Sequence, residues 1–494
     1  MKKQSFLYGA AILAGASILC KIMSAAFKIP LDNIFLHEEG IGIYQSAYSI
    51  YNVVLAFCVT GIPIALSSLV AGSDDKEAAS LCRSTSVMVT FVGALAAILL
   101  FVFSEPLARL LSGGGGAVSA PSLKVLSPAL LVMGIISSRR GYFQGKSMMT
   151  PSGVSQLIES FIKVVLGIGL CAAFVKYGIR YGAAGAIAGV SLGALFSAAV
   201  LEVFFRRAKP QKGQFSYEKA LAVFKISVPM TLGAFAFTAV MLLDTLSVPQ
   251  LLANSGAGEA ERLKLFGLLT RANTIYNLPA TIISAFTASA VPALVYSGND
   301  RSKLGETSLR VIKLIFLAAF PCALGMILFP KELFLLIYSS ESHWELLFLA
   351  GIMVIIMPYL QTTTAMLQTL GKVWAPIWVS VGASVLKILL NMVLIPLYSV
   401  AGAPLATICA FTPAVIINTA MLMKKASLKG GVRIVLKIAL CALFSCGGAR
   451  ILYLFRGGVG ALVMCIALAA GVYALLVLVT KCITKSELTG KGTN

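Results

Sequence analysis

Long apolar segments recur from one end of the chain to the other, with short polar segments between them. Each is about 20 residues or longer, the length that an α-helix needs to cross a bilayer. A helix is favoured because it satisfies its own backbone hydrogen bonds in lipid. The pattern predicts an all-α integral membrane protein with about fourteen transmembrane helices, near residues 6–35, 41–71, 83–111, 121–145, 152–176, 183–205, 219–252, 264–296, 308–338, 344–370, 374–397, 401–423, 433–455 and 458–481.

The two halves of this pattern resemble each other. Short matches recur in the same order at a nearly constant shift, namely Ile50-Tyr51-Asn52 at 275–277, Gly145-Lys146 at 371–372, Lys163 at Lys387, and Ala184-Gly185-Ala186 at 401–403. Six helices return the chain to its starting side, so two such copies should be parallel repeats around a central cavity. We expect an N-terminal lobe at 1–214, a C-terminal lobe at 215–428, and two further helices with a cytoplasmic tail at 429–494.

The first helix carries a polar stripe. The residues that fall on one side of this helix are Ser17, Lys21, Ser24, Lys28 and Asp32. A charge at mid-bilayer costs about 2.5 to more than 10 kcal/mol, so the stripe should face protein or a water-filled cavity. In the alternative reading, the helix begins near Lys21 or ends near Lys28, and the lysines extend to the lipid headgroups.

Three other helices have a polar side as well. Helix 2 carries Asn52 with Gln45 and Tyr48, and helix 8 carries Asn277 beside Arg271. These residues are candidates to line the cavity, although Asn, Tyr and Thr can also simply hold helices together. Arg271 needs an anionic partner, for which Asp32, Asp244 of helix 7 or a substrate anion are the candidates.

Helices 5 and 11 carry the remaining intramembrane charges. Glu159 and Lys163 are four residues apart in the order that favours an ion pair, so they can form a structural pair or take part in coupling. Lys387 has no acidic residue within its own helix and is the better cavity candidate. Close helix contact is expected in helix 6, where Gly185, Gly189 and Gly193 recur every four residues.

Composition narrows the function. Hydrophobic residues make up 58% of the chain and charged residues only 12%, against about 25% charged in soluble domains. The formal charge of +21 is concentrated in alternate connections and in both tails, which predicts cytoplasmic termini and no nucleic-acid partner. The basic residues behind this orientation are Arg139, Arg140, Lys146, Arg206, Arg207, Lys209, Lys212, Arg301, Lys303, Arg310, Lys424, Lys425 and Lys429, with Lys2, Lys3, Lys481, Lys485 and Lys491 in the tails.

Enzyme chemistry has no counterpart in the sequence. The ten cysteines are scattered singly, and the two histidines, His37 and His343, fall in predicted loops, so no metal site or disulfide framework is expected. There is no P-loop and no Gly-x-Ser-x-Gly motif. We expect no cofactor and no catalytic residues.

Residues 139–163 read RRGYFQGKSMMTPSGVSQLIESFIK. This stretch resembles a signature of the stage V sporulation protein B family, polysaccharide-biosynthesis membrane proteins of the multidrug/oligosaccharidyl-lipid/polysaccharide exporter superfamily. The family motif falls on Arg140, Gly141, Tyr142, Phe143, Gln144 and Gly145. The stretches around Lys21 to Leu31, Gly42-Ile43-Tyr44 and residues 275–279 are also similar to this family.

The resemblance implies a flippase-like fold and a lipid-linked saccharide substrate. In the related MurJ-type lipid II flippases, cations of helices 1, 2 and 8 line the cavity. By position, Lys21, Lys28 and Arg271 are their counterparts, with Asp32 and Asp244 balancing charge. This chain departs from the relatives in having no basic residue within helix 2.

These observations predict a flippase that moves an undecaprenyl-diphosphate-linked cell-wall or polysaccharide precursor across the bacterial cytoplasmic membrane. Two alternatives stay open: a cation-coupled drug exporter on the same fold, and a non-transporting scaffold for cell-wall synthesis. A drug exporter should favour acidic and aromatic residues in its cavity. The expected partners are the lipid-linked saccharide, membrane lipids and cell-wall synthesis enzymes, and a monomer is expected.

Overall fold

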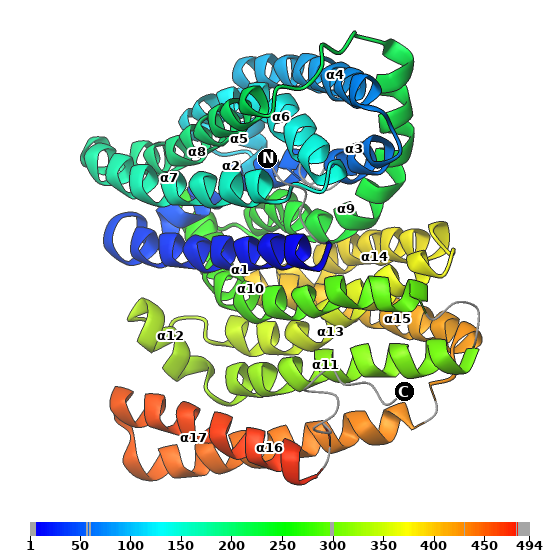
Figure 1. Cartoon of the computed structure of the whole chain (residues 1–494). Helices are drawn as coiled ribbons and strands as arrows, with labels where there is room; N and C mark the ends of the chain where they lie inside the picture. The colour runs from blue at the N-terminus through cyan, green and yellow to red at the C-terminus, as the bar shows by residue number, and fades with distance from the viewer. Residues whose placement is uncertain are drawn as a thin grey trace. The chain divides into compact units, whose positions relative to one another are not determined.

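A computed structural model describes residues 6–55, 58, 61–296, 301–428, 430–480 and 482, and the described part is helical throughout its regular structure (Figure 1). The tail lysines and Lys429, used above for orientation, lie outside these residues. The elements are α1 (Phe6–Pro30), η1 (Leu31–Leu36), α2 (His37–Leu55), α3 (Ile62–Ala71), α4 (Asp75–Val102), α5 (Ser104–Leu111), α6 (Ala120–Gly145), α7 (Thr150–Phe174), η3 (Val175–Tyr177), α8 (Ile179–Arg207), α9 (Tyr217–Asn254), α10 (Glu259–Tyr296), α11 (Arg301–Leu328), α12 (Pro330–Tyr338), α13 (Glu345–Thr369), α14 (Trp374–Tyr398), η4 (Ser399–Ala401), α15 (Gly402–Lys425), α16 (Gly431–Arg456) and α17 (Gly458–Val479).

The chain is a multi-pass membrane protein. Nine helical stretches of the described residues are long and apolar enough to cross a bilayer. The expected number of about fourteen stays a prediction. Large apolar side chains are exposed along several of these helices, for example Phe91 at 71% and Phe444 at 71%. In water such surfaces would be costly, whereas lipid is their natural surrounding.

Several helix boundaries differ from expectation. The segments expected at 83–111 and 308–338 are each divided, into α4 with α5 and α11 with α12. Pro106 and Pro330 lack the backbone N–H that would continue the hydrogen-bond ladder. α4 also begins earlier than expected, because Asp74 caps it by accepting a 2.6 Å hydrogen bond from the Glu77 N–H. Arg139, Arg140 and His37, expected in connections, lie within α6 and at the start of α2.

The divisions recur at equivalent places in the two halves. The break at Phe103 between α4 and α5 reappears at Phe329 between α11 and α12, and η3 reappears as η4. These spacings match the sequence repeat. The halves differ at their first two helices, since α1 runs into the π-helical turn η1 whereas α9 is one continuous helix of 38 residues.

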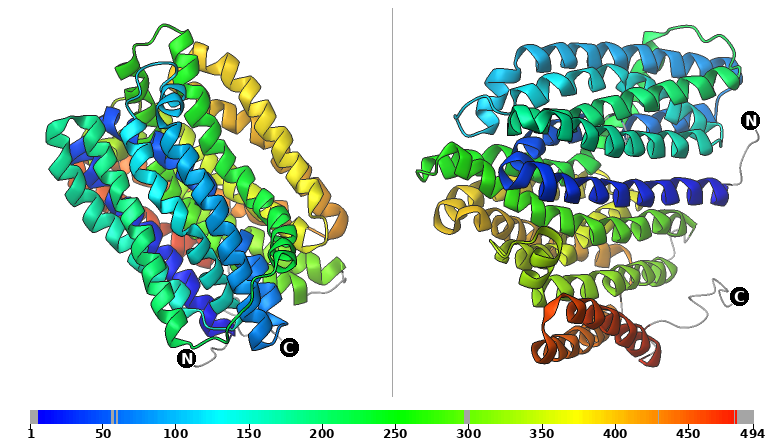
Figure 2. Two further views of the ribbon diagram at one scale, coloured as in Figure 1. Left: turned by 90° about the horizontal axis from the view of Figure 1, so that it is seen from above. Right: turned by 90° about the vertical axis from the view of Figure 1, so that its left-hand side faces the viewer.

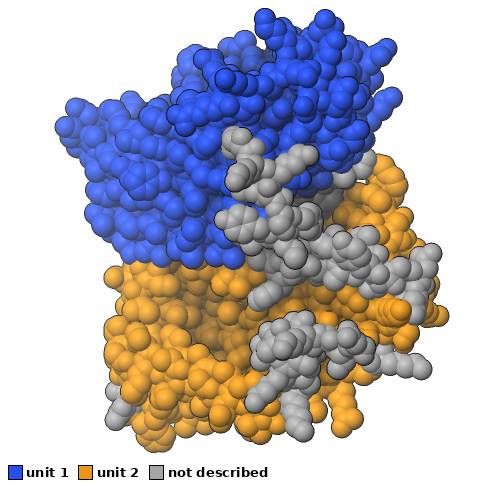
Figure 3. Space-filling model, in the orientation of Figure 1, with its two compact units in different colours: residues 1–271, 388–403 blue, residues 272–387, 404–494 orange. Residues whose placement is uncertain are grey.

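Two compact units divide the chain (Figure 3). Unit 1 comprises residues 1–271 and 388–403, and unit 2 comprises residues 272–387 and 404–494. The unit boundaries thus fall inside α10, α14 and α15. The lobes expected at 1–214, 215–428 and 429–494 are defined by the repeat and stay a prediction.

In unit 1, α7 and α8 run side by side (Figures 1 and 2). The expected glycine contact is found here. A Cβ added at Gly189 would lie 2.3 Å from the Cα of Gly167, and one at Gly193 would lie 2.6 Å from the carbonyl oxygen of Glu159. Only glycine allows backbones to approach this closely, and the contact places Glu159 and Lys163 firmly within the bundle.

In unit 2, α11 packs against α13 and α16, and α16 packs against α17. Arg450 of α16 forms an ion pair with Glu332 of α12 and lies 5.2 Å from the ring centroid of Phe329. A small apolar cluster of Phe329, Ala449, Leu462 and Cys465 supports the same junction. The last two helices are therefore attached to α12 by charge and by packing.

Candidate functional site

The polar stripe of the first helix divides into an accessible and a buried part. Lys21 is exposed, Ser24 and Lys28 are half-buried, and Asp32 is only 1% exposed. Asp32 lies in η1, the π-helical turn that follows Pro30. Since π turns interrupt the ordinary ladder and often mark functional positions, the buried end of the stripe is where an acidic group enters the helix bundle.

Arg271 of α10 binds two carboxylates of unit 1. Its Nε and Nη2 each donate to an oxygen of Asp32 at 2.8 Å, and its Nη1 donates to Glu38 Oε1 at 2.6 Å. The side chains of Arg271 and Asp32 are 3% and 2% exposed. Parallel bonds of this kind are the strong geometry for a guanidinium and a carboxylate. We call Arg271, Asp32 and Glu38 the arginine cluster, and its formal charge is negative.

Lys28 has neutral hydrogen-bonding neighbours instead. Its Nζ donates to Gln45 Oε1 at 3.0 Å, and Gln45 Nε2 donates in turn to Ser49 Oγ at 3.1 Å. Thr245 of α9 donates to the same serine oxygen at 2.8 Å. The ammonium also lies 5.7 Å from the ring centroid of Tyr48, an attractive cation–π contact. A chain of neutral groups thus positions this cation between α1, α2 and α9.

Lys163 of α7 has a similar setting. Its Nζ donates to Ser24 Oγ of α1 at 2.8 Å. The structural ion pair considered for Glu159 and Lys163 is not the pairing found, because Glu159 accepts from Arg140 Nη2 at 2.8 Å. Arg140 is 2% exposed and also donates to Ser155 and Ser197, both at 3.0 Å. A buried guanidinium binds the carboxylate more strongly than a lysine one turn away.

Lys21, Lys28 and Lys163 form the group that we call the lysine site. The positive charges of Lys21 and Lys163 both act on Lys28. The hydrogen bonds of Lys28 and Lys163 described above go to an amide and a hydroxyl, which carry no charge. The carboxylates of Asp32 and Glu159 act on Lys28 and Lys163, respectively, without a hydrogen bond to them. Such a site suits a phosphate or diphosphate, which lysines bind by charge-assisted hydrogen bonds.

Asp244 belongs to a separate polar contact in unit 1. Asn391 donates to Asp244 Oδ1 at 3.5 Å and to Ser247 Oγ at 2.8 Å. Asp244 and Asn391 are both buried. The neighbouring Thr245 reaches Ser49, so this contact connects to the residues that position Lys28.

The remaining expected site residues are distributed over both units. Asn52 is half-buried in unit 1, and Asn277 is half-buried in unit 2. Lys387 of unit 2 is fully buried and donates to Thr407 Oγ1 at 2.6 Å. Lys28 and Asn52 belong to unit 1, whereas Asn277 and Lys387 belong to unit 2. That these residues face one cavity stays a prediction.

The family motif holds helices together. Gly141 and Gly145 of α6 contact α3, where an added Cβ would lie 3.0 Å from Leu66 and 2.7 Å from Val70. Tyr142 and Phe143 pack edge-on against Phe205 of α8, at 5.2 and 6.3 Å between centroids. Gln144 is half-buried. Together with the bonds of Arg140, the motif joins α3, α6, α7 and α8.

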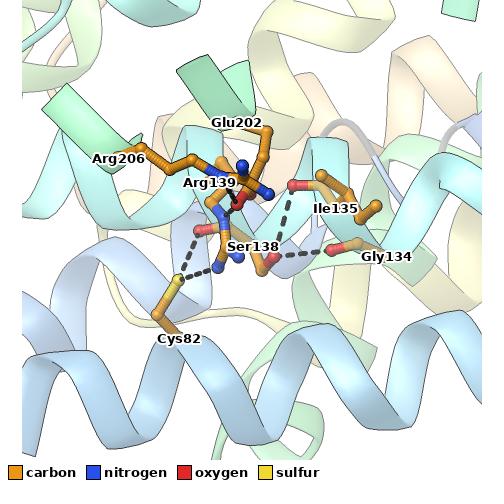
Figure 4. Close-up of polar contacts among 7 residues, drawn as sticks. All are labelled: Cys82, Gly134, Ile135, Ser138, Arg139, Glu202 and Arg206. Carbon is orange, nitrogen blue, oxygen red and sulfur yellow. Dashed lines mark hydrogen bonds and ion pairs between the residues drawn. The ribbon is translucent and has the colours of Figure 1, made fainter. Parts of the chain in front are cut away.

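Two features were missed from the sequence. Glu38 was assigned to a loop, yet it is the second carboxylate on Arg271. Arg139 donates to Glu202 Oε2 and to Cys82 Sγ, both at 3.1 Å (Figure 4). Its guanidinium also lies 3.7 Å from the Phe205 centroid. The only sequence signal for this pair is Glu202, a carboxylate within the apolar segment expected at 183–205. Which basic residue it pairs with depends on which helices lie next to each other.

The chain is similar to several known proteins over most of its length. The family profile described as "Polysaccharide biosynthesis protein" matches residues 6–297. Stage V sporulation protein B of Bacillus subtilis (strain 168) is 26% identical over 509 residues, which cover 99% of this chain and 98% of that protein. Lipid II flippase MurJ of the same organism is 23% identical, over 85% of this chain and 83% of that protein.

Solved structures show the same fold. "Lipid II flippase MurJ, inward closed conformation" aligns with a TM-score of 0.73 at 14% identity, over 95% of this chain and 98% of that chain. An inward-facing multidrug resistance MATE family transporter of the MOP superfamily aligns with a TM-score of 0.69 at 16% identity, over 85% of this chain and 99% of that chain. At these identities the likeness concerns the fold alone.

Proposed function

Because the chain belongs to the polysaccharide biosynthesis protein family, as a relative of stage V sporulation protein B and MurJ, we propose that it translocates an undecaprenyl-diphosphate-linked saccharide across the cytoplasmic membrane. The chain is a membrane protein of the flippase and transporter type, like the relatives named above. The identity of the lipid-linked substrate is the proposed part.

The lysine site is the observation that carries the proposal. A lipid-linked saccharide has a diphosphate between its polar head and its apolar tail. Lys28 and Lys163 offer ammonium groups whose hydrogen bonds go to the neutral side chains of Gln45 and Ser24. A diphosphate can take over these hydrogen bonds and neutralise the charge at the same time. The tail can remain in lipid, beside the exposed apolar faces of the helices.

The arginine cluster supplies the proposed switch. Asp32 and Glu38 occupy Arg271 in this structure. We propose that the diphosphate competes for Arg271 as the two repeats rock, while Asp32 and Asp244 exchange partners, so that the cavity opens to one side at a time. Asn52, Asn277 and Lys387 would line the same path.

A drug exporter on this fold is the main rival, since a multidrug transporter is a fold neighbour. Cationic drugs require acidic or aromatic surroundings. The lysine site would repel them, which favours an anionic substrate. A non-transporting scaffold would have no need of the intramembrane lysines at all, so the experiment below addresses it as well.

The test measures the accessibility of lipid II in the outer leaflet of cells depleted of their own lipid II flippase. Cells receive the wild type, the double variant Lys28→Met/Lys163→Met, or a matched control that removes two exposed charges, Lys176→Met/Lys212→Met. We expect transport by the wild type and the control. The lysine-site variant should lose more than about tenfold, because a hydrogen bond to a charged group contributes about 1.5–3 kcal/mol.

Two outcomes would contradict the proposal in different ways. A lysine-site double variant that is inserted and as active as the wild type would remove the lysine site from substrate binding. A wild type that is inserted but moves no lipid II would exclude lipid II, and other polyprenyl-linked sugars would be tested in the same assay. Resistance to cationic drugs conferred by the wild type would favour the exporter.

A further inference from the structure

Three tyrosines of α2 form a continuous aromatic row. The ring centroids of Tyr44 and Tyr48 lie 5.4 Å apart with their planes at 18°, and those of Tyr48 and Tyr51 lie 5.8 Å apart. Phe27 of α1 contacts the row edge-on, at 5.9 Å from Tyr44. Contacts with Phe27 and between neighbouring rings therefore restrict the rotation of the rings.

Only the middle ring is accessible. Tyr44 and Tyr51 are 1% and 2% exposed, whereas Tyr48 is half-buried. The outer rings thus act as supports, and Tyr48 presents part of its surface. A partly exposed aromatic ring between two buried rings is held in place and can contact a ligand with its exposed part.

The accessible ring lies beside the Lys28 ammonium of the lysine site. Lys28 Nζ is 5.7 Å from the Tyr48 centroid and 6.0 Å from the Tyr44 centroid, and Gln45 holds the ammonium in this place. A lipid acyl chain would gain nothing from an ammonium at this position. The combination of a cation and an aromatic face suits a ligand with an anionic and a carbohydrate part.

A pyranose joined to a diphosphate has this chemistry. Its C–H groups form an apolar face that packs on an aromatic ring, while its hydroxyl groups point outward to water or to polar side chains. The separation of Tyr48 from Lys28 is comparable with the separation of a sugar ring from the phosphate attached to it. The phosphate would contact Lys28 while the first sugar covers Tyr48.

We propose that Tyr48 is a saccharide-binding platform that contacts the sugar attached directly to the diphosphate. This inference rests on the proposed function and adds a specificity residue to it. It also gives a role to helix 2, which lacks the cation that the resemblance to MurJ-type flippases implies and has Gln45 and Tyr48 at this place. In this chain, Tyr48 of α2 would contact the sugar, and the lysines would bind the phosphate.

The experiment compares two lipids on the purified full-length protein. Undecaprenyl diphosphate carrying N-acetylglucosamine and bare undecaprenyl diphosphate are titrated separately, and their affinities are measured. Tyr48→Leu should weaken binding of the sugar-bearing lipid about three- to tenfold, the range expected for an aromatic contact, and leave the bare lipid unchanged. Lys28→Met should weaken both lipids.

Two variants distinguish an effect of the Tyr48 ring from an effect of its hydroxyl group and from a loss of structure. Tyr48→Phe keeps the ring and should bind both lipids like the wild type. Tyr51→Phe removes a buried hydroxyl that has no hydrogen-bond partner among the described residues, and it should be silent. If Tyr48→Leu fails to fold, Tyr48→Gln serves the same purpose on this half-buried position.

The failures are distinguishable. Equal binding of the sugar-bearing lipid by Tyr48→Leu and the wild type would overturn the platform alone. An equal loss for both lipids would assign Tyr48 to phosphate binding or to structure, which also overturns it. A wild type that binds neither lipid would overturn the proposed function, and the platform with it.

Discussion

Arg271 and Lys28 both lie in unit 1, on the polar faces of membrane helices, but their surroundings differ. Arg271 is 3% exposed on its side chain and binds Asp32 and Glu38. Lys28 is half-buried and its ammonium hydrogen-bonds to the neutral Gln45. The charge of Arg271 is neutralised by carboxylates bonded to it, whereas Lys28 is hydrogen-bonded to a neutral group.

This difference assigns Arg271 to the stability of the fold and Lys28 to the proposed ligand binding. Removing one member of a buried ion pair leaves an uncompensated charge, which is costly. Removing an ammonium that is bonded to neutral groups leaves only an amide or hydroxyl, which can find other partners. Basic residues that look alike in the sequence should therefore respond to mutation on different scales, and three substitutions test this.

The largest effect is expected for Arg271→Ala. It leaves Asp32 buried and Glu38 partly buried without their cation, so the free energy of unfolding should fall by about 3–5 kcal/mol. Thermal unfolding of the purified protein measures the loss. The double variant Arg271→Ala/Asp32→Ala should recover part of it, because the buried negative charge is removed as well. A single variant as stable as the wild type would break the comparison.

A smaller effect is expected for Glu38→Gln. The amide oxygen can still accept from Arg271, and both bonds from Arg271 to Asp32 remain. The loss should be about 1 kcal/mol, that of weakening one hydrogen bond. The same unfolding measurement detects it, with Glu39→Gln as the matched neighbour on α2. A loss as large as that of Arg271→Ala would mean that Glu38, rather than Asp32, carries the cluster.

The smallest effect is expected for Lys163→Met. Methionine fills a similar volume, and Ser24 keeps its 2.9 Å hydrogen bond to the carbonyl oxygen of Cys20. Removing a charge that repels Lys28 offsets the lost bond, so the free energy of unfolding should change by less than about 0.5 kcal/mol. A loss of several kcal/mol would place Lys163 among the structural charges, and the lysine site would have to be abandoned.

Much of the fold followed from local patterns. Apolar segment length located the long helices, and the glycine spacing in α8 predicted a close helix contact, which the structure shows with α7. The breaks at Phe103 and Phe329 were missed although Pro106 and Pro330 were visible, because the apolar pattern continues through both. The length of the apolar segments predicted continuous helices there. A proline lacks the backbone N–H of the helical hydrogen bond, so the helix ends near it even where the residues stay apolar.

The pairing of charges could not be read in the same way. The four-residue spacing of Glu159 and Lys163 favours an ion pair within one helix. The fold instead brings Arg140 of α6 to Glu159 and Ser24 of α1 to Lys163. Such contacts depend on which helices adjoin and on their rotation, and neither is encoded in the spacing along one helix.

The sequence by itself determined that this protein is helical, lies in a membrane, is internally duplicated and carries cations among its apolar segments. These properties depend on composition and on short-range periodicity, which each helix expresses independently of the others. The tertiary structure alone decided which of the cations are neutralised. Coulomb and hydrogen-bond energies depend on distances of a few ångströms between side chains, and those distances between Arg271 and Asp32 or Lys28 and Gln45 exist only after α1, α2 and α10 have packed.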